Sequence, residues 1–260
     1  MPQYFPTALA PALAELPARR RSVHSPGYLF DDRLYRALRE LGLSVRIEFD
    51  VEEWKDFIRT TEWPIVNCAA DPAYHDFAAG EVFWMRLSHG SETIATQVFR
   101  MITTDDYVGM IRDQTLFFGK GPSEFQEFAM LPTADLPTIG GLVTQLSGLY
   151  IRPDWRRVRT ADGMRLVAAW TRLSHSFTAR NLMADWSVTT VEERIATPRM
   201  IEELYGYPHA RGIFEAYVPH LERRERITLV WMSAAELVES VASRPRSAGP
   251  SNRRSLHRVE

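Results

Sequence analysis

The sequence predicts an α/β (α+β) domain with a mixed, mostly antiparallel central sheet of about seven strands and helices on both faces. Helical and strand-like periodicities alternate along the chain. A hairpin lies among strand–helix–strand units, which is typical of a mixed sheet covered by helices. The composition is that of a packed globular chain, because 45% of the 260 residues are apolar and 25% are charged.

The first elements are a helix and a strand. Asp31 or Asp32 can cap a helix whose leucines share one face, and Gly42 can end it. Apolar residues then alternate with polar ones over residues 45–49. This alternation predicts a half-buried strand.

A second helix and a hairpin follow. Asp50 and Glu53 have the spacing of a capping box ahead of an apolar helical stripe. Two strands are expected at residues 81–87 and 93–101, and residues 88–91 form the turn between them.

The second half repeats strands and helices. The longest helix is expected to begin near Asp162 or Gly163, where apolar residues recur at helical spacing. Another helix begins at Thr197, which precedes a proline, and ends at Gly206. A capping box at residues 233–236 predicts a last short helix. The remaining strands are expected at residues 142–151, 185–191, 213–218 and 227–232.

The composition of the two ends differs from that of the middle. Residues 1–30 are rich in Ala, Pro and Arg, so we expect a partly disordered extension. Its arginine cluster follows the apolar part instead of preceding it, so no secretory signal is expected and the cytoplasm is predicted. Residues 243–260 form a basic, polar tail that is expected to be disordered. Residues 31–242 remain as one domain.

Charge and residue counts argue against several classes of protein. The formal charge of −2 argues against a nucleic-acid partner, and no apolar run is long enough for a membrane span. Cys68 is the only cysteine, which excludes an internal disulfide framework. The seven histidines lack metal-ligand spacing, so no metal is predicted.

Three segments of the second half carry a family resemblance. They are Gly148–Arg156, Leu204–Tyr207 and Leu229–Ser233. The first resembles the strand, turn and helix that bind acyl-CoA in the GNAT superfamily of N-acyltransferases. The chain is most similar to large, uncharacterised bacterial members. In element order the resemblance covers residues 43–240, so residues 31–242 are expected to form a GNAT-like domain. The resemblance implies acetyl-CoA or another acyl-CoA as co-substrate, and a neighbouring strand that splays away to leave a slot.

The turn after the first segment is the expected nucleotide site. Free backbone N–H groups at a helix start can bind a diphosphate. The family places a glycine at the position of Arg159, whose guanidinium could grip a phosphate instead. The resemblance assigns acyl-CoA binding to Tyr150, Ile151, Arg152, Arg156, Arg157, Val158, Arg159, Thr160, Ala161 and Gly163.

Two residues are candidates for proton transfer. In the family a tyrosine before the helix-ending glycine protonates the leaving thiolate. That position is Glu202 here, so Tyr205 is the nearest phenol. Glu127 is flanked by apolar residues, and a partly buried carboxylate there would have a raised pKa and could act as a base. Asp185 and His175 flank the strand after the main helix, and either could reach the slot.

Three functions remain open at this stage. The first is transfer of an acyl group from acyl-CoA to a small-molecule amine. The second is synthesis of N-acyl amino acids or acyl-lactones from an acyl-carrier protein. The third is a non-catalytic ligand-binding protein, for which the Arg159 side chain is expected to close the turn. The family's final strands often mediate dimers, so a homodimer is one state that the resemblance allows.

Overall fold

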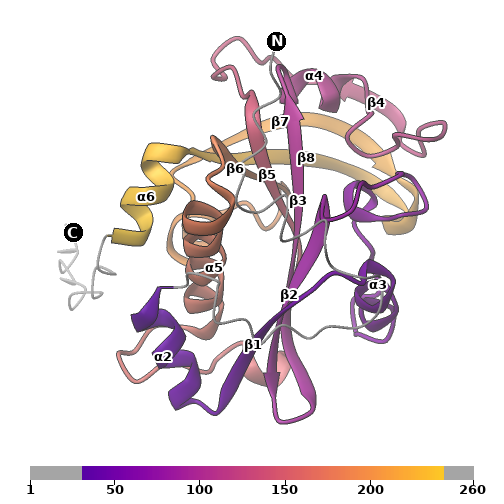
Figure 1. Cartoon of the computed structure of the whole chain (residues 1–260). Coiled ribbons are helices and arrows are strands. Elements are labelled where there is room, and N and C mark those ends of the chain that lie inside the picture. Colours follow the sequence, from indigo (N-terminus) through magenta and orange to yellow (C-terminus); the bar gives the residue numbers. More distant parts are fainter. Residues whose placement is uncertain (1–30, 243–260) are drawn as a thin grey trace, which may run out of the picture.

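Eight strands form one sheet in the order β1-β2-β3-β5-β6-β8-β7-β4, in a computed structural model that describes residues 31–242 (Figure 1). The expectations for residues 1–30 and 243–260 lie outside the described residues. The strands are β1 (Leu43–Glu48), β2 (Val82–His89), β3 (Glu92–Thr104), β4 (Gln126–Met130), β5 (Gly141–Ile151), β6 (Trp186–Glu192), β7 (His209–Val218) and β8 (Arg223–Ser233). The α-helices are α2 (Asp32–Glu40), α3 (Val51–Arg59), α4 (Tyr107–Arg112), α5 (Leu166–Phe177) and α6 (Ala234–Ala242).

The predicted fold class is confirmed. Every neighbouring pair of strands is antiparallel except β5 and β6, which run parallel. The sheet has eight strands instead of about seven. The additional strand is β4, a short edge strand within a stretch that gave no clear periodicity.

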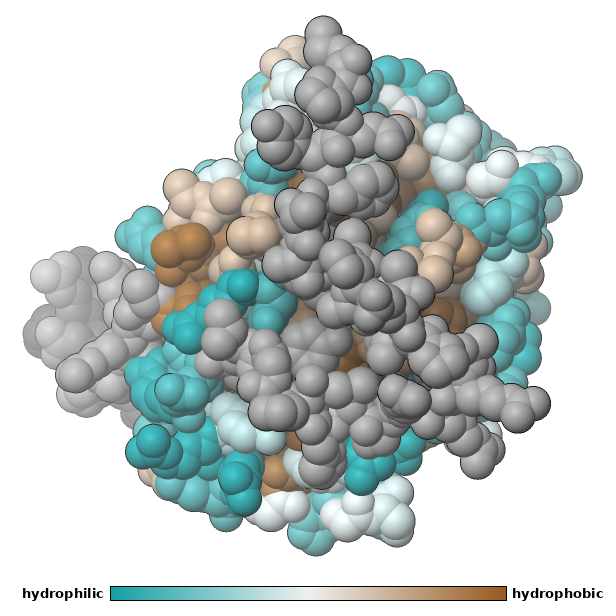
Figure 2. Space-filling model, in the orientation of Figure 1, coloured by the Kyte–Doolittle hydropathy of each residue, from teal (hydrophilic) through white to brown (hydrophobic). Residues whose placement is uncertain are grey.

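Helices cover both faces of the sheet. Helices α2, α5 and α6 lie on one side, and α3 and α4 lie on the other (Figure 1). Leu38, Trp170 and Leu237 belong to one buried core, whereas Trp54 of α3 belongs to another. Figure 2 shows hydrophilic residues over α2 and an apolar patch over α6, whose Val238 is 60% exposed.

Local capping signals identified the starts of α2, α3 and α6. The Asp31 carboxylate accepts a hydrogen bond from the Leu34 N–H, and Asp50 accepts one from Glu53. The Glu236 carboxylate accepts the Ser233 N–H at 2.8 Å, which completes the second capping box. These caps depend on neighbours in sequence, which is why the sequence alone predicts them.

Helix α5 begins later than expected. The prediction of a start near Asp162 or Gly163 is wrong, because the chain there folds into a small hairpin-like turn. Arg159 and Arg165 form an isolated antiparallel bridge, and the Leu166 N–H donates to the Val158 carbonyl. The first N–H of α5 is therefore already used inside the turn.

The parallel strands β5 and β6 separate after a short contact. They pair only at Val143–Trp186, Thr144–Ser187 and Gln145–Val188. Beyond this point β5 continues along β3, and β6 continues along β8. The register between β3 and β5 also shifts here, where Gly148 has a φ of +56°. The sheet is thus open between two of its central strands.

A buried arginine fixes the two loops that lie beside this opening. The Arg100 guanidinium donates to the Ala69 carbonyl at 2.8 Å and to the Leu116 carbonyl at 3.0 Å, and pairs with Glu81. His75 Nε2 donates to the Phe117 carbonyl at 3.2 Å. These bonds hold the segment around Ala69 against the segment around Phe117.

Substituting Gly148 with alanine should destabilise the protein strongly. The new Cβ would lie 2.5 Å from the Trp54 ring, at a positive φ that L side chains rarely adopt. Backbone strain and overpacking together predict a loss of about 2–5 kcal/mol. Gly90→Ala is the matched control, because Gly90 has a φ of +58° and no atom near the added Cβ. It should cost about 1–2 kcal/mol in a denaturant unfolding curve, and equal losses for the two variants would contradict the expected clash.

Stability should fall as the pH drops below about 6.5. Burial, and secondarily the Arg100 charge, lower the pKa of His75 to about 4. Because the folded-state pKa of His75 lies below the unfolded value, the protein has its full stability above pH ~6.5. Stability is then lost as the pH falls toward the folded-state pKa. His75→Gln keeps an N–H donor without titrating. The wild type should lose about 1 kcal/mol more than this variant between pH ~6 and ~5, and parallel pH profiles from urea unfolding would show that His75 does not titrate this way.

Candidate functional site

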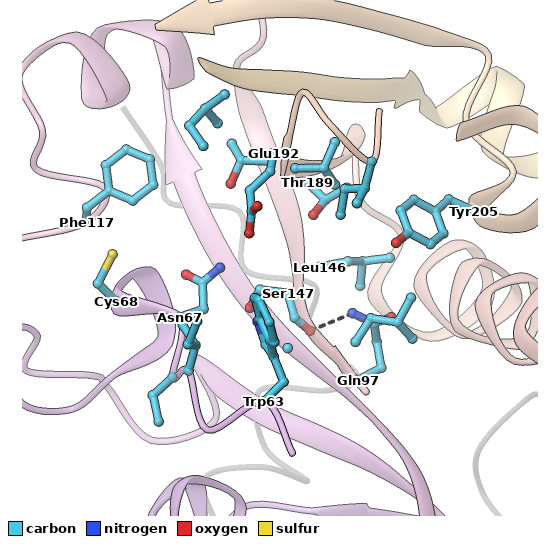
Figure 3. Close-up of a pocket in the computed structure, with 18 of the residues that line it drawn as sticks. Trp63, Asn67, Cys68, Gln97, Phe117, Leu146, Ser147, Thr189, Glu192 and Tyr205 are labelled. Carbon is cyan, nitrogen blue, oxygen red and sulfur yellow. Dashed lines mark hydrogen bonds between the residues drawn. The ribbon is translucent and has the colours of Figure 1, made fainter. Parts of the chain in front are cut away.

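A cavity of about 270 Å³ lies where β5 and β6 separate (Figure 3). Residues 146–149 of β5 and 189–192 of β6 line it from the two strands. Residues 65–68 and Phe117 line it from the two loops that Arg100 fixes. The opening in the sheet is therefore a walled site of the size of a ligand pocket.

Three polar side chains point into the cavity from separate elements (Figure 3). They are Glu192 at the end of β6, Asn67 of the loop before β2, and Tyr205 at the end of the π-helical segment Arg199–Tyr205. Ligands of α/β sheets bind at the carboxyl ends of parallel strands, where Glu192 stands.

Glu192 is a largely buried carboxylate with two cationic partners. Its side chain is 19% exposed and pairs with Arg194 at 2.5 Å and with Arg223 at 3.2 Å. Arg194 also lies over the ring of Trp63, which borders the same cavity. The carboxylate is thus held at the cavity between two arginines that are themselves partly exposed.

Tyr205 offers its hydroxyl to the cavity. Within residues 31–242 the hydroxyl has no hydrogen-bond partner, although the backbone carbonyl of Tyr205 accepts His175 Nε2 at 2.7 Å. Burial, followed by the nearby Glu192 charge, raises the pKa of Tyr205 above its ordinary value. The phenol therefore stays protonated at neutral pH and can donate a proton.

Two cavity-lining residues carry buried polar atoms without partners. Ser147 Oγ and His175 Nδ1 have no hydrogen bond to any atom of the described chain. Ser147 is 6% exposed and His175 is 1% exposed. Burial lowers the pKa of His175 to about 4, so at neutral pH its Nδ1 is a hydrogen-bond acceptor. Buried polar atoms are normally paired, so these two stand out among the residues that line the cavity.

The opposite wall of the cavity is apolar. The rings of Phe117, Phe125 and Phe214 meet there, with centroids 5.2–5.6 Å apart. Cys68 also borders the cavity, but burial raises the pKa of its thiol to about 12. Cys68 therefore remains a neutral thiol and is unsuited to act as a nucleophile.

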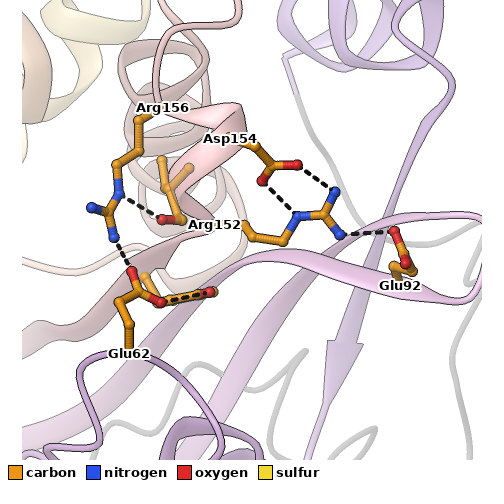
Figure 4. A network of polar contacts seen from close by, with 7 residues as sticks. Glu62, Glu92, Arg152, Asp154 and Arg156 are labelled. Carbon is orange, nitrogen blue, oxygen red and sulfur yellow. Dashed lines mark hydrogen bonds and ion pairs between the residues drawn. The ribbon is translucent and has the colours of Figure 1, made fainter.

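The predicted nucleotide site lies outside this cavity. None of the residues assigned to acyl-CoA binding lines it. Arg152 forms two hydrogen bonds with Asp154, at 2.7 and 2.8 Å, and one with Glu92 at 2.7 Å (Figure 4). Arg156 pairs with Glu62 and donates to the Ile151 carbonyl at 2.9 Å (Figure 4).

The rest of the turn also bonds to itself. Arg159 donates to the Gly163 carbonyl at 2.6 Å, so its side chain closes the turn. Thr160 is buried and its hydroxyl donates to the Met164 carbonyl. The remaining assigned residues take separate places: Tyr150 donates to Glu62, Val158 packs on the core, and Arg157 and Ala161 are exposed.

The predicted setting of Glu127 is wrong. Its side chain is 68% exposed on the edge strand β4 and pairs with Arg224 at 3.2 Å. The apolar neighbours turn inward, while a φ of 51° at Glu127 marks a bulge in the strand. The partial burial on which its role as a base depends is absent.

Two of the other candidate residues line the cavity, and one does not. Tyr205 and His175 both line the cavity. Asp185 does not, because its carboxylate accepts the Leu142 N–H at the start of β5. The sequence reasoning missed Glu192 and Asn67. Glu192 could have been found as the carboxylate that ends the predicted strand at residues 185–191, beside a parallel neighbour.

Within residues 31–242, no helix is long and apolar enough to cross a membrane. No group of three or more His, Cys, Asp or Glu side chains in this part of the chain gathers as metal ligands would.

No model of a protein family matches the sequence, and no curated protein matches it. Among solved structures, one similar chain is a polyamine N-acetyltransferase of Drosophila melanogaster that catalyses the formation of N-acetylagmatine. The two chains share 10% identity with a TM-score of 0.39, over 73% of this chain and 100% of the other.

Proposed function

We propose that this protein is an acyltransferase that moves an acyl group from a pantetheine thioester, such as acetyl-CoA or another acyl-CoA, to an amine. The observation that carries the proposal is the separation of β5 from β6 after Gln145–Val188, with a cavity between the two strands. The family that the sequence resembles has such a slot at this place. An extended arm with amide groups can lie between the two strands there.

The cavity offers a base and an acid for this reaction. The nitrogen of the neutral amine attacks the thioester carbon, a C–N bond forms and the carbonyl electrons move onto oxygen. Glu192 accepts the proton that this nitrogen then loses, directly or through a water molecule. When the carbonyl re-forms, the C–S bond breaks and the sulfur leaves with its electron pair. Tyr205 protonates this thiolate. A proton then passes from Glu192 through solvent to Tyr205, which restores both groups.

One observation favours the non-catalytic alternative. The Arg159 side chain closes the turn, as expected for a protein that no longer binds the nucleotide. The free Tyr205 hydroxyl and the Glu192 carboxylate in one cavity favour catalysis instead. Turnover decides between them, because a binding protein would bind the thioester without releasing thiol.

An acyl-CoA should stabilise the fold. A ligand at 100 times its Kd adds about 2.7 kcal/mol to the free energy of unfolding. For a chain of this size that raises the melting temperature by several degrees. Thermal unfolding with millimolar acetyl-CoA measures the shift, with S-methyl thioacetate as a control that lacks the pantetheine arm. An unchanged melting temperature with acetyl-CoA would contradict the proposal.

Removing the base or the acid should slow thiol release from acetyl-CoA in the presence of a panel of primary amines. Glu192→Gln and Tyr205→Phe should each lower kcat by about 10²–10⁴-fold, the usual contribution of one acid or base. The folded state should persist, since each change keeps the side-chain shape.

Two matched variants serve as controls for these losses. Glu193→Gln alters the adjacent carboxylate, which pairs with Arg226 and lies outside the cavity lining. Tyr217→Phe removes a phenol on β7 that also lies outside it. If Glu192→Gln matches Glu193→Gln in rate, Glu192 is not the base.

A further inference from the structure

We infer that this protein recognises its donor by the pantetheine arm and that the nucleotide of CoA adds little to binding. The inference rests on the proposed function and specifies the donor. Its chemistry is a pantetheine thioester, which either free CoA or a phosphopantetheinylated carrier protein can supply. Two independent sets of contacts lead to it, one at the turn before α5 and one in the cavity.

Part of the backbone of the turn is already hydrogen-bonded. The Thr160 N–H donates to the Met164 carbonyl at 2.9 Å, and the Gly163 N–H donates to Thr160 at 2.8 Å. The Val158 carbonyl takes the first N–H of α5 at 2.9 Å. A diphosphate needs several such N–H groups free and pointing at it. Here the turn uses three of them, those of Thr160, Gly163 and Leu166, to hold its own shape.

Three arginines at the turn are also occupied, whereas Arg157 is exposed. Arg152, Arg156 and Arg159 all have partners inside the described chain. Two of these partners are remote in sequence, since Glu62 comes from the loop after α3 and Glu92 from β3. A diphosphate would have to displace these carboxylates or lie beside their negative charges. Both arrangements are unfavourable, so the diphosphate binds more weakly.

The cavity, in contrast, offers groups that lack partners. Ser147 Oγ can donate to an amide carbonyl, and His175 Nδ1 can accept an amide N–H. A pantetheine arm contains two amides, each with one N–H and one carbonyl. Leu146 and Leu149 line the same stretch and can contact the methylene groups between the amides. The arm therefore matches what the cavity leaves unsatisfied.

The test is calorimetric titration of the full chain with four probes. Acetyl-CoA and acetyl-pantetheine share the arm, adenosine 3′,5′-bisphosphate carries the nucleotide end alone, and an acetylated carrier protein presents the arm on a protein. We expect acetyl-pantetheine to bind within about fivefold of acetyl-CoA, and the bisphosphate not to compete at millimolar concentration.

The outcomes separate this inference from the proposed function. A Kd for acetyl-CoA more than about 100-fold below that of acetyl-pantetheine overturns the inference and leaves the proposed function intact. If no acetyl probe binds, the proposed function fails as well. Tighter binding of the carrier protein than of acetyl-pantetheine supports the inference with a carrier as the source. Equal or weaker binding of the carrier supports it with free CoA as the source.

Substitution at the turn gives a second measurement. Arg159→Ala should change the Kd of acetyl-CoA by less than about threefold, as should Arg112→Ala, which alters an exposed arginine on α4. If Arg159 instead grips a phosphate, losing that charge-assisted bond would weaken acetyl-CoA binding by about 10–100-fold and leave acetyl-pantetheine unaffected.

Substitution in the cavity completes the test. Ser147→Ala should weaken acetyl-CoA and acetyl-pantetheine by the same factor, about 3–10-fold, the value of one hydrogen bond. Ser176→Ala is the matched control, because Ser176 Oγ is also buried without a partner in the described chain but Ser176 does not line the cavity. Equal effects of the two variants would show that Ser147 does not contact the arm.

Discussion

The separation of β5 from β6 is the constraint on which the rest of the site depends. Backbone N–H and carbonyl groups inside a sheet normally pair with the next strand, and buried groups without partners are costly. Side chains of β3 take over part of this pairing. Thr96 donates to the Gly148 carbonyl and Gln97 to the Ser147 carbonyl. Because side chains of β3 satisfy these two carbonyls of β5, the slot between β5 and β6 can stay open.

The sequence predicted most of the fold because its signals are local. Caps such as Asp31 and Asp50 bond to residues three positions away, and strand alternation needs only a few residues. Strand β4 escaped prediction because an exposed edge strand shows no apolar alternation. The late start of α5 escaped it because the Arg159–Arg165 bridge opposes the helical periodicity of the same segment.

The site was harder to predict because its contacts are distant in sequence. Tyr205 could be identified from its place before a helix-ending glycine. Glu127 could not be judged, because apolar neighbours in sequence do not fix which side of an edge strand is buried. The partners of Arg156 and Arg152 lie 94 and 60 residues away. With 31 basic and 33 acidic side chains, the charge balance also gives no sign of which arginines are free.

Strand β4 affects the order in which the chain folds. It lies between β3 and β5 in sequence, yet its Ala129 pairs with Glu215 of β7 at the far edge of the sheet. Closing such a long loop requires the distant strand to be present first. On a ribosome, β4 therefore cannot complete its pairing until β7 has emerged. The aromatic wall of the cavity is also complete only then, because Phe214 belongs to β7.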